Sequence, residues 1–339
     1  MPANLTPEYK AAEAAYRQAR DPRERLERLR EMLRTIPKHK GTDHLQGDIK
    51  RRIKELSEEI EGPKKGGARG GPVLVIRPEG AAQIALIGPP NAGKSSLHAR
   101  LTGSEARAAP YPFTTEYPEP GMMPYEDIHF QLLDLPAISP DHRAPWLSNT
   151  LETADACLLV ADVREADCVE RMEALHAVLR EKRVTLTARW EQSAESLNTA
   201  ADEDPFALWL PALILANKTE RIADVAAELE AFLELTGFDY PALAVSAETG
   251  QGLGEIGPWL FRSLGIVRVY TKAPGRPADK GRPFTLRRGQ TVEDVARLVH
   301  QDIAHGLKYA RVWGSSGFDG QHVGRDHPVR DGDLIELHT

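Results

Sequence analysis

The stretch GPPNAGKS, residues 88–95, matches the pattern G-x-x-x-x-G-K-[ST]. An apolar run, Ile84–Ile87, precedes it and a helix-like segment, Ser96–Leu101, follows it, which is the strand–loop–helix context that the pattern requires. The glycines allow backbone N–H groups to turn inward around phosphate oxygens, and the helix that follows adds the positive end of its dipole. The stretch therefore predicts an α/β domain of the P-loop type that binds a nucleotide.

Side chains in and near this loop have the chemistry that phosphate binding needs. We expect Lys94 to offset the charge of the β- and γ-phosphates, and Ser95 to offer its hydroxyl to Mg²⁺. Asp134 ends a second apolar run, and an acidic residue at such a place holds Mg²⁺, usually through water. The loop residues predicted to contact the nucleotide are Asn91, Ala92, Gly93, Lys94, Ser95 and Ser96.

Two later segments indicate which base is bound. The sequence NKTE, residues 217–220, follows an apolar run; its carboxylate can accept hydrogen bonds from the ring N1–H and the exocyclic amine of guanine, which adenine does not offer. The sequence SAE, residues 246–248, follows the last apolar run, where a backbone N–H can reach the guanine oxygen. An ATP-using P-loop enzyme such as a small kinase is the less favoured alternative, because these segments and the lack of an acceptor-site signature argue against it. The residues predicted to bind the guanine nucleotide here are Asn217, Lys218, Glu220, Ser246, Ala247 and Glu248.

Short apolar runs continue through the central region. Helix-length segments separate them, which predicts buried parallel strands of an α/β sheet. We expect residues 180–206, which are polar and irregular, to be an insertion, and we assign residues 73–265 to this domain. The runs after Ile84–Ile87 are Phe130–Leu133, Cys157–Val160, Leu213–Leu215 and Leu243–Val245.

The N-terminal region has a helical composition. Residues 1–61 are dense in Ala, Leu, Arg and Glu, and Asp21-Pro22 suits a helix start with Pro at the first helical position. With a second helix from Asp43 to Ile60, the region predicts a helical hairpin or a short coiled coil. Residues 62–72 are Gly-rich and basic, and we expect a linker there.

The last 74 residues, 266–339, change pattern again. Val267–Tyr270 and Leu334–Leu337 predict strands, and Thr291–His300 predicts a capped helix. This mixture indicates a small α+β domain. In such a domain we expect Trp313 and Phe318 to be buried, although either ring could stack on a nucleic-acid base.

Composition excludes several classes of protein. No run of 18 or more apolar residues is present, and the first ten residues do not resemble a secretory signal, so we predict a cytoplasmic protein without membrane contact. The two cysteines, Cys157 and Cys168, are not at zinc-finger spacing with any histidine and suit a reducing compartment.

Charge is unevenly distributed along the chain. Residues 1–70 carry 17 Lys and Arg against 12 Asp and Glu, residues 71–265 carry 14 against 29, and residues 266–339 carry 12 against 9. An acidic centre between basic flanks suggests a polyanionic partner. Ordinary variation of surface charge explains the same surpluses, and both interpretations stay open.

These motifs together resemble the Obg-related GTPases, and most closely the developmentally regulated GTP-binding type. The phosphate-binding loop, the segment YPFTT at residues 111–115, and LDLP at residues 133–136 are similar to that group. The segments VYTK at 269–272, TVED at 291–294, KYARVWG at 308–314 and VGRDH at 323–327 resemble its C-terminal TGS domain, and KGTDHL at 40–45 resembles its helical N-terminus. The resemblance covers most of the chain.

The resemblance implies a Ras-like domain and a β-grasp TGS domain in a slow, Mg²⁺-dependent GTPase that switches between GTP and GDP forms. It implies that Thr115 or its neighbour Thr114 joins the Mg²⁺ ligands, and that the backbone N–H of Ala137 meets the γ-phosphate. Asn91 occupies the position that helps to hold K⁺ in potassium-stimulated relatives, a role we weigh against simple loop stabilisation. The implied partners are the ribosome or RNA, with a protein partner of the TGS domain as the rival.

Two residues depart from the family pattern. Ala137 stands where Gly is usual, and Glu220 stands where Asp is usual. The Cβ of Ala137 restricts backbone rotation, and Glu220 is one methylene longer. Ile138 cannot orient water as the Gln of Ras-type GTPases does. An alternative function is therefore a nucleotide-binding scaffold, a pseudo-GTPase with little turnover.

Overall fold

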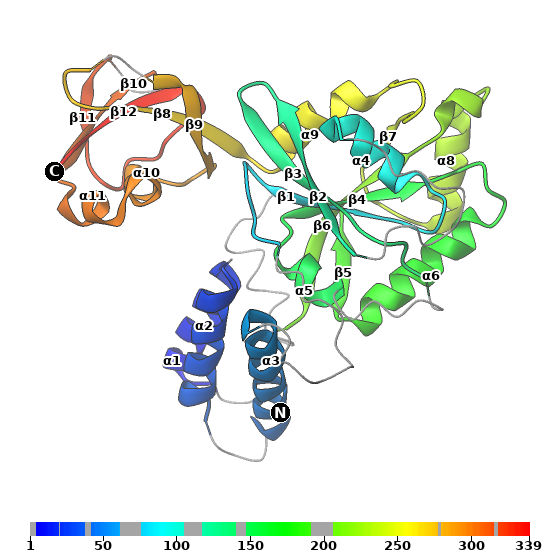
Figure 1. Ribbon diagram of the computed structural model, residues 1–339, viewed down its shortest axis with the longest axis horizontal. Coiled ribbons are helices and arrows are strands. Elements are labelled where there is room, and N and C mark those ends of the chain that lie inside the picture. Colours follow the sequence, from blue (N-terminus) through cyan, green and yellow to red (C-terminus); the bar gives the residue numbers. More distant parts are fainter. Residues whose placement is uncertain are drawn as a thin grey trace.

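The computed structural model describes residues 5–19, 21–37, 42–61, 76–104, 117–139, 147–190, 206–276, 279–314 and 318–339. Figure 1 shows three parts in chain order: a group of N-terminal helices, a central α/β domain and a small C-terminal domain. Within the described residues, no helix is both long and apolar enough to cross a membrane.

The central domain is built on one twisted sheet with the strand order β2-β3-β1-β4-β6-β5, and β7 also pairs with β6. All pairings are parallel except that of β2 with β3, so the predicted, mostly parallel sheet is confirmed. Four of the five apolar runs lie wholly within a strand, and the fifth, Leu243–Val245, extends one residue beyond β7. The strands are β1 (Gln83–Ile87), β2 (Glu119–Tyr125), β3 (Ile128–Asp134), β4 (Ala156–Ala161), β5 (Val184–Thr187), β6 (Leu208–Ala216) and β7 (Ala242–Ala244).

Helices cover both faces of this sheet (Figure 1), and each face has its own apolar core. On one side, α5 (Leu147–Glu152), α6 (Cys168–Glu181) and α8 (Val225–Thr236) pack beneath side chains such as Ala85 and Ile87. On the other, α4 (Lys94–Thr102) and α9 (Ile256–Ser263) pack on Ile84 and Leu86. Burial on both faces explains why the central strands are continuous apolar runs rather than alternating patterns.

The expectation of an irregular insertion at residues 180–206 is partly wrong. Val184–Thr187 form β5, which pairs in parallel with the start of β6 and closes that edge of the sheet. Only four residues long and half polar, this strand lacks the length that makes an apolar run recognisable. Residues 191–205 lie outside the described residues.

The N-terminal part is helical, and it contains three helices where a hairpin or a short coiled coil requires two. They are α1 (Pro7–Gln18), α2 (Pro22–Thr35) and α3 (Asp43–Glu61). The predicted start at Asp21-Pro22 is confirmed, because the Asp21 carboxylate accepts hydrogen bonds from the backbone N–H groups of Arg23 and Glu24. The predicted linker at residues 62–72 falls outside the described residues. The helices share a core that includes Tyr9, Leu29, Met32 and Ile49.

This helical part contacts the central domain at the end of α5. Glu152 there accepts hydrogen bonds from Arg25 of α2, at 2.6 Å, and from Arg52 of α3. Phe206, just before β6, belongs to the core of the helical part, and the Arg52 guanidinium lies 4.3 Å from the centroid of its ring. Two arginines on one carboxylate therefore fix the helices to the central domain.

The C-terminal domain is a five-stranded mixed sheet with the order β11-β10-β12-β8-β9 and two helices on one face (Figure 1). The predicted small α+β domain is thus confirmed, and Thr291 with Asp294 forms a capping box at α10. Its central pair, β8 and β12, is parallel. The elements are β8 (Ile266–Lys272), β9 (Asp279–Arg287), α10 (Val292–Val299), α11 (Gln301–Gly306), β10 (Tyr309–Trp313), β11 (Gln321–Val323) and β12 (Asp333–His338).

The expectation that Trp313 and Phe318 are buried is wrong. Phe318 is 67% exposed. Trp313 is half-buried, on the sheet face away from the helices, with the Lys272 ammonium 3.8 Å from its ring centroid. The core of this domain consists instead of aliphatic residues such as Val269, Val312 and Ile335.

Candidate nucleotide-binding site

The phosphate-binding loop joins the end of β1 to the start of α4, as the pattern predicts. Lys94, the first residue of α4, is 7% exposed, and its ammonium donates hydrogen bonds to the carbonyl groups of Gly88 at 3.1 Å and Pro89 at 3.0 Å. Burial lowers the pKa of Lys94 to about 8, and the nearby Asp134 carboxylate acts in the opposite direction. A cation that is shielded from water is stabilised when an anion binds next to it, so this site favours anion binding.

Asp134 lies beside the loop because β3 pairs with β1 and places it opposite Leu86. Its side chain is buried, and its Oδ1 atom has no hydrogen-bond partner within the part of the chain that the structure describes. Burial raises the pKa of Asp134, whereas a hydrogen bond with Ser95 and the charge of Lys94 lower it. An unpaired carboxylate oxygen next to a hydroxyl suits a hard, oxygen-binding cation, so these residues fit Mg²⁺.

The other predicted phosphate-sensing residues are only partly described. Thr114 and Thr115 lie outside the described residues. Ala137 is buried, and the backbone N–H of Ile138 approaches the Gly88 carbonyl at 3.4 Å. The Ile138 side chain belongs to the apolar core beneath the sheet, so this side chain points away from the loop's phosphate side.

The Asn217 side chain ties the phosphate-binding loop to the segment at residues 246–248. Its amide group donates a hydrogen bond to the Ala92 carbonyl at 2.9 Å, and its oxygen accepts one from the Ala247 N–H at 3.1 Å. Gly93 has a positive φ of 93°, and a Cβ atom there would lie 2.3 Å from the Asn217 amide nitrogen. Only glycine therefore fits between the helix start and this amide.

Lys218 is fixed by two contacts on opposite sides. Its ammonium donates to the Asn91 carbonyl at 2.8 Å and forms an ion pair with Asp162 at 2.7 Å. Burial alone would raise the pKa of Asp162, but hydrogen bonds from Lys218 and Arg164 hold it below its ordinary value. Sequence reasoning missed Asp162, although its place directly after β4 is the same kind of signal that singled out Asp134.

Glu220 lies in a single 3₁₀ turn, Thr219–Arg221, beyond β6. Its Oε2 atom is buried and has no hydrogen-bond partner in the described part of the chain. A hydrogen bond with Ser246 lowers the pKa of Glu220, so this carboxylate is ionised at neutral pH. Glu248 differs, because its side chain is 66% exposed and forms an ion pair with Arg221 at 3.5 Å.

These residues line one cavity of about 700 Å³. Seven predicted residues line it: Gly93, Ser96, Asn217, Lys218, Glu220, Ala247 and Glu248. Arg100 and Ser104 line it too, and sequence reasoning missed them. They come from the far end of α4 and the residues after it, a place that no motif spacing marks. The cavity thus joins the helix of the phosphate-binding loop to the buried Glu220 carboxylate.

Comparison with known proteins agrees with this geometry. Residues 83–189 match the family of 50S ribosome-binding GTPases, and residues 267–339 match the TGS domain. Developmentally-regulated G-protein 2 of Arabidopsis thaliana is 27% identical over 360 residues, which cover 93% of this chain and 90% of the plant protein. This chain is a relative of the developmentally regulated GTP-binding proteins. It carries a P-loop GTPase domain, called the G domain below, followed by a TGS domain.

Other relatives of the same type extend this result. A GTP-binding protein of Methanocaldococcus jannaschii is 27% identical over 366 residues, covering 93% of this chain and 92% of its own length. The crystal structure of a GTP-binding protein from Pyrococcus horikoshii matches 76% of this chain and 99% of its own with a TM-score of 0.51, and at 16% identity it shows a shared fold. The expected resemblance to the developmentally regulated GTP-binding proteins and the expected fold class are therefore confirmed.

Nucleotide affinity should depend on pH through Lys94. The free site holds this amine at a pKa of about 8, and a bound phosphate must raise that value because it stabilises the ammonium. We therefore predict that GDP affinity is level below about pH 8 and falls by up to about tenfold per pH unit above it. Calorimetric titration near pH 8 should also detect proton uptake on binding. Equal affinity at about pH 7 and about pH 9, without proton uptake, would contradict this role.

Proposed function

We propose that the protein is a GTP-driven switch that hydrolyses GTP slowly with Mg²⁺. The observation that carries the proposal is the Glu220 carboxylate, which is ionised and whose Oε2 atom has no partner among the described residues, in a cavity that extends to Gly93 of the phosphate-binding loop. Guanine offers two adjacent N–H donors to such a carboxylate, and adenine offers none at the same edge. The phosphates would then lie on the loop, with Lys94 offsetting their charge.

Magnesium would be held by Ser95 and Asp134, with Thr115 or Thr114 as the further ligand, and would neutralise charge on the transferred phosphoryl group. Lys94 would act on the same phosphates, and the Ala137 N–H would contact the γ-phosphate. Ile138 lies in the core and cannot orient the attacking water, which agrees with slow intrinsic turnover. A pseudo-GTPase would bind the same nucleotide without releasing phosphate, so a turnover assay with GTP and ATP separates the two.

Replacing Glu220 tests the base specificity. In Glu220→Gln an amide faces the guanine donors, so we expect GDP affinity to fall by about 10-fold to 100-fold, as for loss of a charged hydrogen bond. Affinity for ADP should not change. The matched control is Glu234→Gln, which alters an exposed carboxylate on α8, away from the residues that line the cavity, and should leave GDP affinity unchanged. Equal losses for GDP and ADP in the Glu220 variant would argue against a guanine site.

We further propose that K⁺ accelerates the hydrolysis through Asn91. Asn91 has a positive φ of 62°, and its backbone carbonyl is already occupied by Lys218, which leaves the side-chain oxygen for a cation beside the phosphates. The variant Asn91→Gly keeps this backbone conformation and removes the oxygen. Turnover in K⁺ should exceed turnover in Na⁺ at equal ionic strength, and the variant should lose the difference. Indistinguishable wild-type rates in the two salts would refute the K⁺ role.

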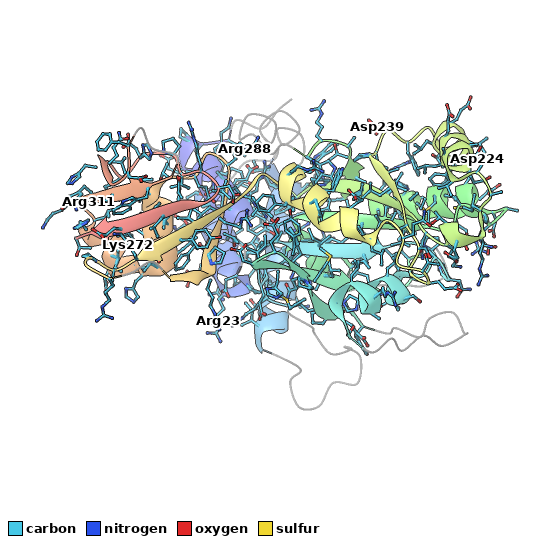
Figure 2. The ribbon with its side chains drawn as sticks, turned by 90° about the horizontal axis from the view of Figure 1, so that it is seen from above. Arg23, Asp224, Asp239, Lys272, Arg288 and Arg311 are labelled. Carbon is cyan, nitrogen blue, oxygen red and sulfur yellow. The ribbon has the colours of Figure 1, made fainter. Side chains whose placement is uncertain are left out.

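The basic flanks suggest attachment to the ribosome or to RNA, because a polyanion is repelled by the acidic G domain. In the TGS domain, Arg288 and Arg311 (Figure 2) form no ion pair with a carboxylate among the described residues. Cations of this kind are available to phosphate groups. A protein partner of the TGS domain is the rival, and its binding would depend less on salt.

Charge reversal should distinguish these partners. We predict that Arg288→Glu with Arg311→Glu weakens co-sedimentation with ribosomes and reduces the slope of log affinity against log salt by roughly 1 to 2. Lys182→Glu places one such charge reversal on an exposed site of the G domain and should have little effect. If binding changes neither with salt concentration nor in the double variant, a protein partner is favoured. If the wild type does not bind ribosomes at low salt, the proposed attachment is rejected.

A further inference from the structure

The tip of the β2–β3 hairpin contacts the TGS domain. The hairpin turns through Glu126 and Asp127, and both carboxylates meet the guanidinium of Arg268 on β8, that of Asp127 at 3.0 Å. The hydroxyl of Tyr270 donates a second hydrogen bond to Asp127. The Arg268 guanidinium also lies 4.9 Å from the ring centroid of Phe261, a residue of α9 in the G domain. Two neighbouring side chains of one TGS strand thus hold one hairpin turn.

Arg268 is held in place from the TGS side as well. Asp331 accepts hydrogen bonds from its Nε at 3.0 Å, its Nη2 at 2.8 Å and its backbone N–H at 2.8 Å. The Arg268 side chain is only 17% exposed, so solvent screens these contacts less than a surface ion pair. Partial burial would raise the pKa of Asp127, but the hydrogen bonds from Tyr270 and Arg268 keep it below its ordinary value. The contact between the domains is therefore ionic and preorganised.

The base of the same hairpin lies in the nucleotide site. β3 ends at Asp134, the candidate Mg²⁺ residue, and β2 begins at Glu119, which pairs with Asp134 across the ladder. In the sequence, β2 follows Thr114 and Thr115 by a few residues, and β3 precedes Ala137 by three. Both ends of the hairpin thus continue into residues proposed to sense the γ-phosphate.

The hairpin also packs closely on the helix of the phosphate-binding loop. A Cβ atom at Gly121 of β2 would lie 2.6 Å from His98 and 2.7 Å from Thr102, so the β2 backbone rests directly on α4. Because α4 begins with Lys94, β2 cannot shift relative to the loop without repacking this contact. Movement at the base of the hairpin should therefore reach its tip.

Glu126 at the turn has a positive φ of 48°, a conformation that is unfavourable for a residue with a Cβ. A glycine would adopt it without strain. The carboxylate that glycine lacks is one of the two that meet Arg268. Contact with the TGS domain gives a physical reason for glutamate at this position.

We propose that the β2–β3 hairpin couples the nucleotide state of the G domain to the TGS domain through the contact of Asp127 with Arg268 and Tyr270. The coupling rests on the proposed GTP switch. The conformation at the base of the hairpin depends on whether GTP or GDP is bound. The ionic contact at the tip of the hairpin transmits this conformational change to β8. Because coupling between two binding sites is reciprocal, a partner on the TGS domain changes the preference for GTP over GDP by the same factor, typically about 5-fold to 150-fold.

A second contact makes a selective test possible. Arg287 of β9 forms an ion pair with Asp155 at 3.0 Å, and the backbone N–H of Arg288 donates to the Gly265 carbonyl at 2.7 Å. These contacts are independent of the hairpin, so they should keep the TGS domain attached when the hairpin contact is removed. Asp127→Ala then removes one of the two carboxylates on Arg268 and the acceptor of the Tyr270 hydroxyl without releasing the domain, and Tyr270→Phe removes one hydroxyl as a milder change.

Hydrogen exchange of the full-length protein, with GDP or with a non-hydrolysable GTP analogue, measures the coupling directly. In the wild type, amides of the hairpin and of β8 should both exchange at different rates in the two nucleotide states. In Asp127→Ala the hairpin should still respond and the response of β8 should be strongly reduced, because only Glu126 then remains on Arg268. In Tyr270→Phe the response of β8 should be reduced less. Glu293→Gln breaks an ion pair within the TGS domain, with Arg297 and Arg325, and should keep the wild-type response.

The outcomes separate the coupling from the proposed function. The coupling is refuted if the wild type binds guanine nucleotides but exchange in β8 is the same in both nucleotide states, or if β8 responds equally in Asp127→Ala. Either result leaves the proposed GTP site intact. Failure of the wild type to bind either guanine nucleotide would overturn both.

Discussion

The nucleotide site depends on one buried amide. Asn217 bridges the Ala92 carbonyl and the Ala247 N–H, and so it fixes the distance between the phosphate-binding loop and the loop that follows β7. A buried amide with both its groups paired is stable, and the loss of either partner leaves a costly unpaired group. The same close approach leaves no room for a Cβ atom at Gly93. Without the bridge, phosphate and base recognition would belong to two independent loops.

The same site contains groups that are unfavourable without a ligand. Lys94 is a buried cation with only carbonyl partners, while Asp134 and Glu220 each present a buried carboxylate oxygen without a partner in the described residues. Such groups reduce the stability of the free protein, and a ligand of complementary charge removes the penalty. Nucleotide phosphates, Mg²⁺ and the guanine edge are complementary to Lys94, Asp134 and Glu220 respectively. Binding is therefore expected to stabilise the folded G domain.

The sequence predicted those elements whose pattern is set by their own burial. Strands β1 and β4 are covered on both faces, so they read as unbroken apolar runs. β2 was not predicted from the sequence. This edge strand contains Gly121 and Pro124, and glycine and proline are disfavoured inside β-strands. Arg100 reaches the cavity from the far end of α4, which no motif spacing marks, whereas Asp162 lies directly after β4 and could have been recognised from that place. The contact between Asp127 and Arg268 joins residues 141 positions apart and belongs to tertiary structure alone.

The central claim is that the cavity recognises guanine rather than nucleotides in general. Titration of the full-length wild-type protein with labelled GDP and labelled ADP, in the presence of Mg²⁺, tests it most directly. The ionised Glu220 carboxylate and the Ala247 loop predict clearly tighter binding of GDP, by at least about tenfold, the loss that leaving one buried charged acceptor unpaired would bring. Equal affinities for GDP and ADP would contradict the account and leave a P-loop protein without base specificity.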